Sequence, residues 1–155
     1  MKIGTLVSGV AGTAAVAVSA LVMAPPASAA APTTATVQVD CGDWGTGRAT
    51  VTAEQREGAP AVTFSTPVVW AHHSIPADSI STTATLSAAH GRTATLTGKA
   101  NPAWTLLGQP FDSGVLTGTV TPGEAYRFTS ITSTFGSLTI HCTAVSAQTP
   151  GPFVF

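Results

Sequence analysis

The stretch TTATLSAAHGRTATLTG, residues 82–98, decides the fold class of this chain. Apolar residues at Ala84 and Leu86 alternate with threonine and serine, and the same alternation resumes after His90 at Ala94 and Leu96. A period of two is typical of a β-strand with one buried and one solvated face. The stretch therefore predicts two antiparallel strands joined by a short turn, with the threonine rows facing solvent.

The same alternation recurs on both sides of this predicted hairpin. Six further segments carry strand signals: residues 37–41, 49–54, 62–65, 115–121, 126–135 and 138–144. Gly and Pro punctuate the intervals, and no stretch after Pro32 favours a long helix. About eight short strands predict an all-β domain, either a two-layer antiparallel β-sandwich of the immunoglobulin-like kind, which we expect, or a small β-barrel as the alternative.

The N-terminus has the pattern of a secretory signal. Lys2 precedes an apolar run at residues 3–24, and the small residues Ala27 and Ala29 suit signal peptidase. We expect cleavage after Ala29, which removes residues 1–29 and leaves a secreted, extracellular protein without a membrane span. The alternative is a permanent anchor, because the apolar run is just long enough to cross a bilayer. The mature chain then divides into a linker at 30–35, a β domain at 36–148 and an apolar C-terminal tail at 149–155.

The few charges of the mature chain exclude whole classes of partner. The full chain has six Lys and Arg and seven Asp and Glu, and loss of Lys2 with the signal leaves five against seven. This small acidic excess provides no basic patch for nucleic acid or anionic lipid. The partner we expect is an extracellular ligand or a cell-surface component of unknown identity.

Cys41 and Cys142 are the two cysteines of the chain. Each lies among the inward-facing residues of a predicted strand, and an oxidising compartment offers them only each other. We therefore predict one disulfide bond, which requires the first and last strands to lie close together. The pattern leaves open whether the bond crosses a core between two sheets or joins neighbouring strands.

These features resemble an uncharacterised family of secreted actinobacterial proteins. The resemblance rests on the Ala-rich signal, the Thr/Ala-rich central strands, and the segments VQVDCG at 37–42 and LTIHC at 138–142. It implies an immunoglobulin-like β-sandwich and an extracellular location. It implies no activity and no site residues.

Few residues are candidates for catalysis or metal binding. His72 and His73 are adjacent, and neighbouring side chains on a strand point to opposite faces, so the pair cannot readily hold one metal ion. Asp40 and Asp43 supply too few oxygens for a calcium site, and the chain has no nucleophile-elbow motif. We therefore expect no catalytic residues, no metal and no cofactor.

The tryptophans are the better candidates for ligand binding. Trp44 lies among glycines in a predicted turn, Trp104 follows Asn101-Pro102-Ala103, and an exposed indole can stack on a sugar or fill a partner's pocket. The alternative is that all three tryptophans fill the core or its ends, which we expect for Trp70 in the apolar run 68–71 and also favour for Trp44. Three hypotheses follow: a non-catalytic extracellular binding module, a carbohydrate-binding domain that uses Trp44 and Trp104, and a hydrolase or metal enzyme built on His72 or His73.

Overall fold

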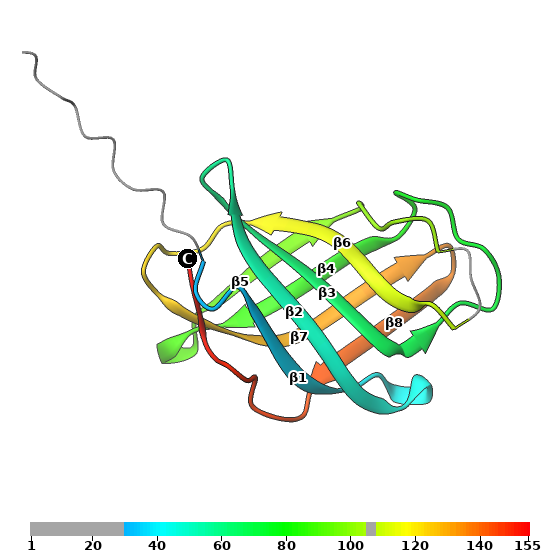
Figure 1. Ribbon diagram of the computed structural model, residues 1–155, viewed down its shortest axis with the longest axis horizontal. Coiled ribbons are helices and arrows are strands. Elements are labelled where there is room, and N and C mark those ends of the chain that lie inside the picture. Colours follow the sequence, from blue (N-terminus) through cyan, green and yellow to red (C-terminus); the bar gives the residue numbers. More distant parts are fainter. Residues whose placement is uncertain (1–29, 105–107) are drawn as a thin grey trace, which may run out of the picture.

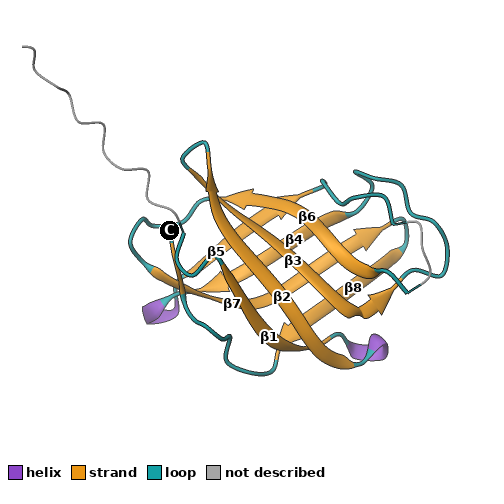
Figure 2. Ribbon diagram, in the orientation of Figure 1, coloured by secondary structure: helices purple, strands orange, loops and turns teal. Residues whose placement is uncertain are grey.

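The computed structural model describes residues 30–104 and 108–155, so the predicted signal at 1–29 lies outside the described residues (Figure 1). The described residues form these strands: β1 (Thr34–Asp40), β2 (Thr46–Arg56), β3 (Ala59–Trp70), β4 (Ser81–Ser87), β5 (Thr93–Gly98), β6 (Pro110–Gly118), β7 (Ala125–Phe135), β8 (Leu138–Ala144) and β9 (Phe153–Val154). Two single-turn 3-10 helices, η1 (Gly42–Trp44) and η2 (Ala89–Gly91), lie in the connections (Figure 2). Within these residues no helix has the length and apolarity needed to cross a membrane.

Strands β1 to β8 close into an antiparallel barrel. Around the barrel the neighbours are β1, β2, β3, β6, β5, β4, β7 and β8, and β8 pairs again with β1. Two pairings produce the closure: β4 with β7 along its whole length, and β1 with β8 at Val39–Ala144 and Asp40–Thr143. The all-β prediction is confirmed. The two-layer sandwich is not confirmed, and the structure supports the barrel alternative.

Long, bent strands allow this closure. β2 has 11 residues and β3 has 12, so the segment predicted at 62–65 is only the centre of β3. The ladder between β3 and β6 shifts register twice, between Thr63 and Ser65 and between Thr66 and Trp70. Such bulges bend a strand and increase its twist, as a small barrel requires. Alternation with a period of two is the same in a sandwich and in a barrel, which is why it did not separate them.

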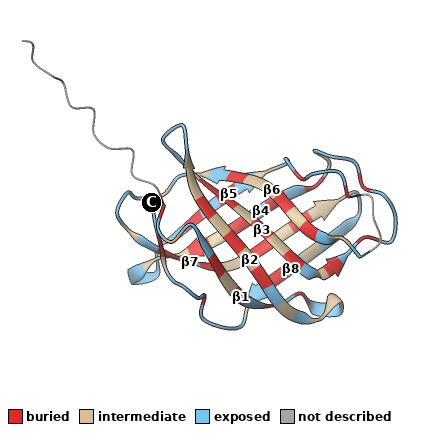
Figure 3. Ribbon diagram, viewed as in Figure 1, coloured by how far each residue is buried: buried red, intermediate tan, exposed pale blue. Residues whose placement is uncertain are grey.

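The inward side chains fill the barrel, as the buried stripes across the strands show (Figure 3). Phe64, Leu86, Leu96 and Leu116 are fully buried, and the Phe64 ring stacks on Phe128 with 5.2 Å between centroids. The predicted alternation holds in β4 and β5, where Ala84, Leu86, Ala94 and Leu96 face inward. The predicted outer rows hold as well, since Thr83, Thr93, Thr95 and Thr97 are exposed. Thr82 lies on the inward face with Ala84, where it is buried and its hydroxyl lies 3.0 Å from that of Ser133.

One end of the barrel, here called the tail end, is covered by the C-terminal tail. β9 pairs with the start of β7 at Ala125–Val154 and Tyr126–Phe153, and Val154 exchanges two backbone hydrogen bonds with Ala31. Phe153 and Phe155 are buried. The segment 30–35, predicted as a linker, contributes to the same structure, since Ala30 and Ala35 are buried. The chain therefore uses both of its described ends to close the barrel on this side (Figure 1).

The disulfide lies on the line where the barrel closes. Cys41 and Cys142 are bonded, with 4.0 Å between their Cα atoms and 101 residues between them in sequence. They continue the β1–β8 register one step beyond the pair Asp40–Thr143. The predicted disulfide is confirmed, and it joins neighbouring strands rather than crossing the core.

Candidate functional site

The opposite end, here called the tryptophan end, holds a small apolar cup. Its walls and floor come from segments that are far apart in sequence: Trp44 from η1, Trp70 and His72 from the end of β3 and the loop after it, Trp104 from the β5–β6 connection, Phe135 from the end of β7 and Leu138 from the start of β8. Its cavity volume is about 50 Å³. Pockets that enclose a drug-sized ligand measure about 300–1,000 Å³, so this cup accepts the tip of a ligand rather than a whole molecule.

Three rings form one wall of the cup and are called here the aromatic trio: Trp44, Trp70 and His72. Ring centroids lie 4.2 Å apart for Trp70 and His72, 6.0 Å for Trp44 and His72, and 6.3 Å for Trp44 and Trp70. The two indole planes meet at 89°. The indoles therefore make a corner, and they cannot both stack on one flat surface.

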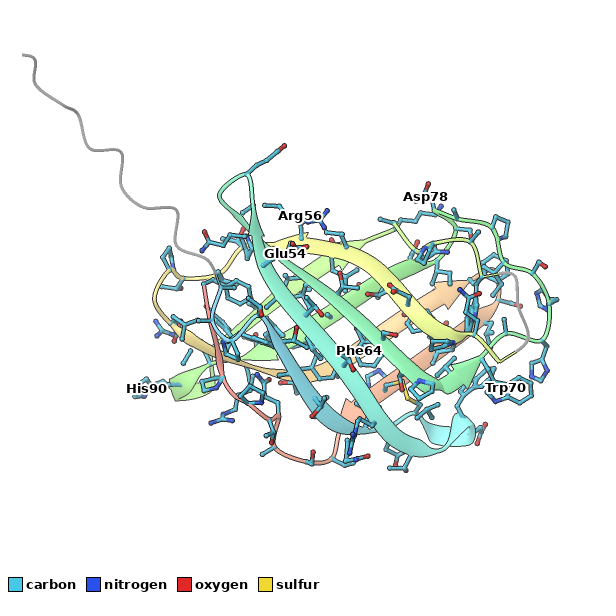
Figure 4. All side chains as sticks on the ribbon, viewed as in Figure 1. Glu54, Arg56, Phe64, Trp70, Asp78 and His90 are labelled. Carbon is cyan, nitrogen blue, oxygen red and sulfur yellow. A yellow bond between two sulfur atoms is a disulfide. The ribbon has the colours of Figure 1, made fainter. Side chains whose placement is uncertain are left out.

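Trp70 is 43% exposed, which shows that the prediction of a core position for it was wrong. Alternation carried on from Phe64 and Thr66 would place Val68 and Trp70 inside the barrel. The register shift between Thr66 and Trp70 changes the phase, so that Val69 is buried instead and Trp70 faces out. A one-residue slip sends every following side chain to the other face. Trp70 therefore lies at the rim of the barrel, as Figure 4 shows.

Of the two predicted ligand-binding residues, Trp44 lies in the wall of the cup and Trp104 in its floor. Trp44 is half-buried, and Trp104 is 5% exposed. The indole N–H of Trp104 donates to the carbonyl oxygen of Gln109 at 2.8 Å, and its ring packs 5.5 Å from that of Phe111. The structure brings both tryptophans to one concave surface with His72. Trp104 is buried and hydrogen-bonded, so it supports the site and does not present a ring face to a ligand.

Asn101 holds the loops of the cup together and was not predicted as a site residue. Its side-chain oxygen accepts hydrogen bonds from the backbone N–H groups of Ser79 and Ile80, and its NH₂ group donates to the carbonyl oxygens of Pro76 and Pro102. The residue is buried with all of these groups paired. It is the sole asparagine of the sequence, in an irregular Pro-containing stretch, and that is the signal that could have found it.

The described residues carry their acidic excess at the tryptophan end. Four aspartates lie in this half of the barrel, Asp40, Asp43, Asp78 and Asp112, against the cations Arg48 and Lys99. Asp43 precedes Trp44 in η1, and Asp78 lies on the loop that carries His72, at the same end as Trp70 in Figure 4. In the tail half three glutamates balance three arginines, and Glu54–Arg56 and Arg92–Glu124 are ion pairs. The cup is thus mostly apolar inside, and the half of the barrel that holds it carries four aspartates against two cations.

The histidines lie in separate settings. His72 packs on the two tryptophans, whereas the ring of His73 lies 6.5 Å from Phe135. His141 contacts the hydroxyls of Thr132 and Thr143 on the outer face of the barrel, and His90 belongs to η2 at the tail end. Across residues 30–104 and 108–155, no group of three or more His, Cys, Asp or Glu side chains is arranged to hold a metal ion. The arrangement offers aromatic faces and an apolar floor, which suit binding.

Comparisons with known proteins do not identify this barrel. The chain matches no family model, no curated protein and no solved structure. The resemblance to secreted actinobacterial proteins therefore stays a prediction.

Proposed function

We propose that the protein is a secreted, non-catalytic binding module, and that its binding face is the cup at the tryptophan end. The observation that carries this proposal is the exposure of two large apolar side chains on the same cup, Trp70 at 43% and Leu138 at 42%. Exposed apolar groups that gather at a concave site mark interaction surfaces, and tryptophan is enriched among the residues that dominate binding energy.

The disulfide supports an extracellular place of action. The Cys41–Cys142 bond lies at the closure of the barrel, and such bonds persist in oxidising compartments. The secretory-signal pattern at residues 1–29 indicates the same extracellular location. A binding role outside the cytoplasm agrees with both features.

A carbohydrate ligand is the second candidate, and one observation favours it. The exposed Trp70 ring lies beside an exposed imidazole, that of His72, and a sugar needs both an aromatic face and hydrogen-bonding groups. The perpendicular indoles disfavour a flat polysaccharide surface. In this candidate function, a single sugar ring stacks on Trp70.

A titration followed by NMR tests the binding role. The secreted protein, labelled with ¹⁵N, receives three soluble probes separately: choline chloride, a trimer of N-acetylglucosamine and benzyl alcohol. We expect at least one probe to shift the Trp44, Trp70 and His72 resonances in a saturable way. Trp70→Ala should abolish the response, while Val145→Ala, which removes a side chain that is 57% exposed and does not line the cup, should leave it intact.

Two outcomes would count against this function. The first is that none of the three probes shifts the cup resonances. The second is that Trp70→Ala binds the probes as the wild type does. A response to the sugar trimer alone would select the carbohydrate candidate over the others.

A further inference from the structure

We propose that the cup binds a quaternary ammonium group carried on a small, unphosphorylated cationic molecule. This inference rests on the binding function proposed above and names its ligand class. The juxtaposition that carries it is an aromatic corner, formed by Trp44, Trp70 and His72, in the half of the barrel that holds the acidic excess.

The ring geometry suits a cation better than a flat ligand. The face of an aromatic ring carries partial negative charge, and a cation within about 6 Å of the ring centroid is attracted to it. The planes of Trp44 and Trp70 are perpendicular, and His72 lies 4.2 Å and 6.0 Å from their centroids. A roughly spherical group placed at this corner can contact several rings at once, whereas a planar ligand can stack on only one indole.

The hydrogen-bonding groups in the floor of the cup are already paired, which favours a ligand group that needs no hydrogen bonds. The hydroxyl of Ser133 is paired with that of Thr82, and the indole N–H of Trp104 with the carbonyl of Gln109. Apart from the imidazoles of His72 and His73, the remaining described lining residues are apolar or aromatic, among them Ile75, Ile80 and Phe135. A primary ammonium has three N–H groups, and the exposed imidazoles of His72 and His73 offer too few acceptors for them, so its loss of water here is costly. A quaternary ammonium has no N–H to satisfy, so its methyl groups can enter.

The volume of the cavity and the charge at this end of the barrel restrict the class of ligand further. The cavity volume of about 50 Å³ matches the tip of a ligand, with the remainder outside the cup. Asp43 lies next to Trp44 in η1 and Asp78 lies on the loop that carries His72, so both add negative charge at this end and favour a cation. They also repel phosphate, so a phosphocholine headgroup is disfavoured. Free choline is the simplest molecule with the required chemistry.

The decisive experiment compares choline with its uncharged carbon analogue, 3,3-dimethyl-1-butanol, by NMR titration of the secreted protein at constant ionic strength. The two molecules have nearly the same shape, so an apolar cup binds them alike. Cation–π attraction at a desolvated site makes choline bind at least about tenfold more tightly. Equal affinities would overturn the ammonium assignment and leave the binding function standing.

Other outcomes also separate the two proposals. A response to benzyl alcohol or the sugar trimer without any response to choline would overturn the ammonium assignment alone. Stronger binding of phosphocholine, or of phosphatidylcholine vesicles, than of choline would overturn the choice of an unphosphorylated ligand. Choline binding that Trp70→Ala leaves unchanged would overturn both proposals, because the ligand would then lie elsewhere.

Matched substitutions test the rings and the charge separately. His72→Phe keeps an aromatic face and should retain choline affinity within about threefold, whereas His72→Ala should weaken it by about tenfold. Asp43→Asn removes one negative charge near the cup and should weaken choline binding by about threefold at low salt. Glu57→Gln removes the same charge at the tail end and should have no effect. If both charge variants behave alike, the aspartates do not contribute to recognition.

Discussion

The side chain of Asn101 binds the backbone of Ile80: its carboxamide oxygen accepts the Ile80 N–H at 2.7 Å. Ile80 lies at the end of the loop that carries His72 and His73, and Asn101 lies in the β5–β6 connection that carries Trp104. One buried amide thus joins the wall of the cup to its floor. The loop that carries His72 is therefore held by a residue that does not line the cup.

Replacement of Asn101 should therefore loosen the tryptophan end. We expect Asn101→Ala to lower the free energy of unfolding by about 3 kcal/mol, because the N–H groups of Ser79 and Ile80 lose their partner while remaining buried or half-buried. Urea denaturation measures this change. Gln38→Ala, which truncates an exposed amide on β1, should stay within about 0.5 kcal/mol of the wild type. A loss for Asn101→Ala as small as the control's would show that the loop does not need this anchor.

The two kinds of tryptophan should differ in their effect on stability. Trp104→Ala empties a buried position and removes the hydrogen bond to Gln109, so we expect it to cost about 3–5 kcal/mol. Trp70→Ala removes an exposed ring and should cost about 1 kcal/mol or less. Thermal and urea unfolding of the two variants provide the comparison. Similar losses for both would place Trp70 in the core after all.

The disulfide should stabilise the barrel strongly. Its loop spans 101 residues, and in the chain-entropy model a loop of about 100 residues contributes about 4.7 kcal/mol. We expect the double variant Cys41→Ser, Cys142→Ser to lose about 3–5 kcal/mol and to exchange amide hydrogens faster along the short β1–β8 ladder. Unfolding curves and hydrogen exchange test this. A reduced protein as stable as the oxidised one would mean that β1 and β8 hold together without the bond.

Neighbouring residues of β9 provide a matched test of the tail end. Phe153 is fully buried and Val154 is 37% exposed. Phe153→Ala should lower the free energy of unfolding by about 3–5 kcal/mol through the cavity it leaves. Val154→Ala keeps the backbone bonds to Ala31 and should cost about 1 kcal/mol or less. Equal, small effects would show that the tail does not close the barrel.

Much of the strand content could be predicted from the sequence, because half-buried strands alternate with a period of two. The pattern located β4, β5 and β8 and the inward positions of Cys41 and Cys142. It placed β6 too late, at 115–121 instead of Pro110–Gly118, because Pro110 and Gly114 are typical loop residues. Gly114 is nevertheless a strand residue, and this position requires glycine because a Cβ there would clash with the carbonyl group of Ala100.

The alternation pattern could not predict how the barrel closes or which residues line the cup, and the reason is different. Which strands pair across the closing line depends on long-range register, as in β4 with β7, and local alternation carries no such information. The outward position of Trp70 depends on a single register shift beside Pro67. A proline within a predicted strand is a known sign of a bulge. Pro67 could therefore have led to the prediction that Trp70 is exposed and lies near Trp44.

One measurement tests the central claim most directly: the intermolecular nuclear Overhauser effects between the methyl protons of choline and the protein, at saturating choline. The account predicts contacts from these methyl groups to the ring protons of Trp44, Trp70 and His72. Contacts confined to other parts of the surface, or no contacts at all, would contradict it.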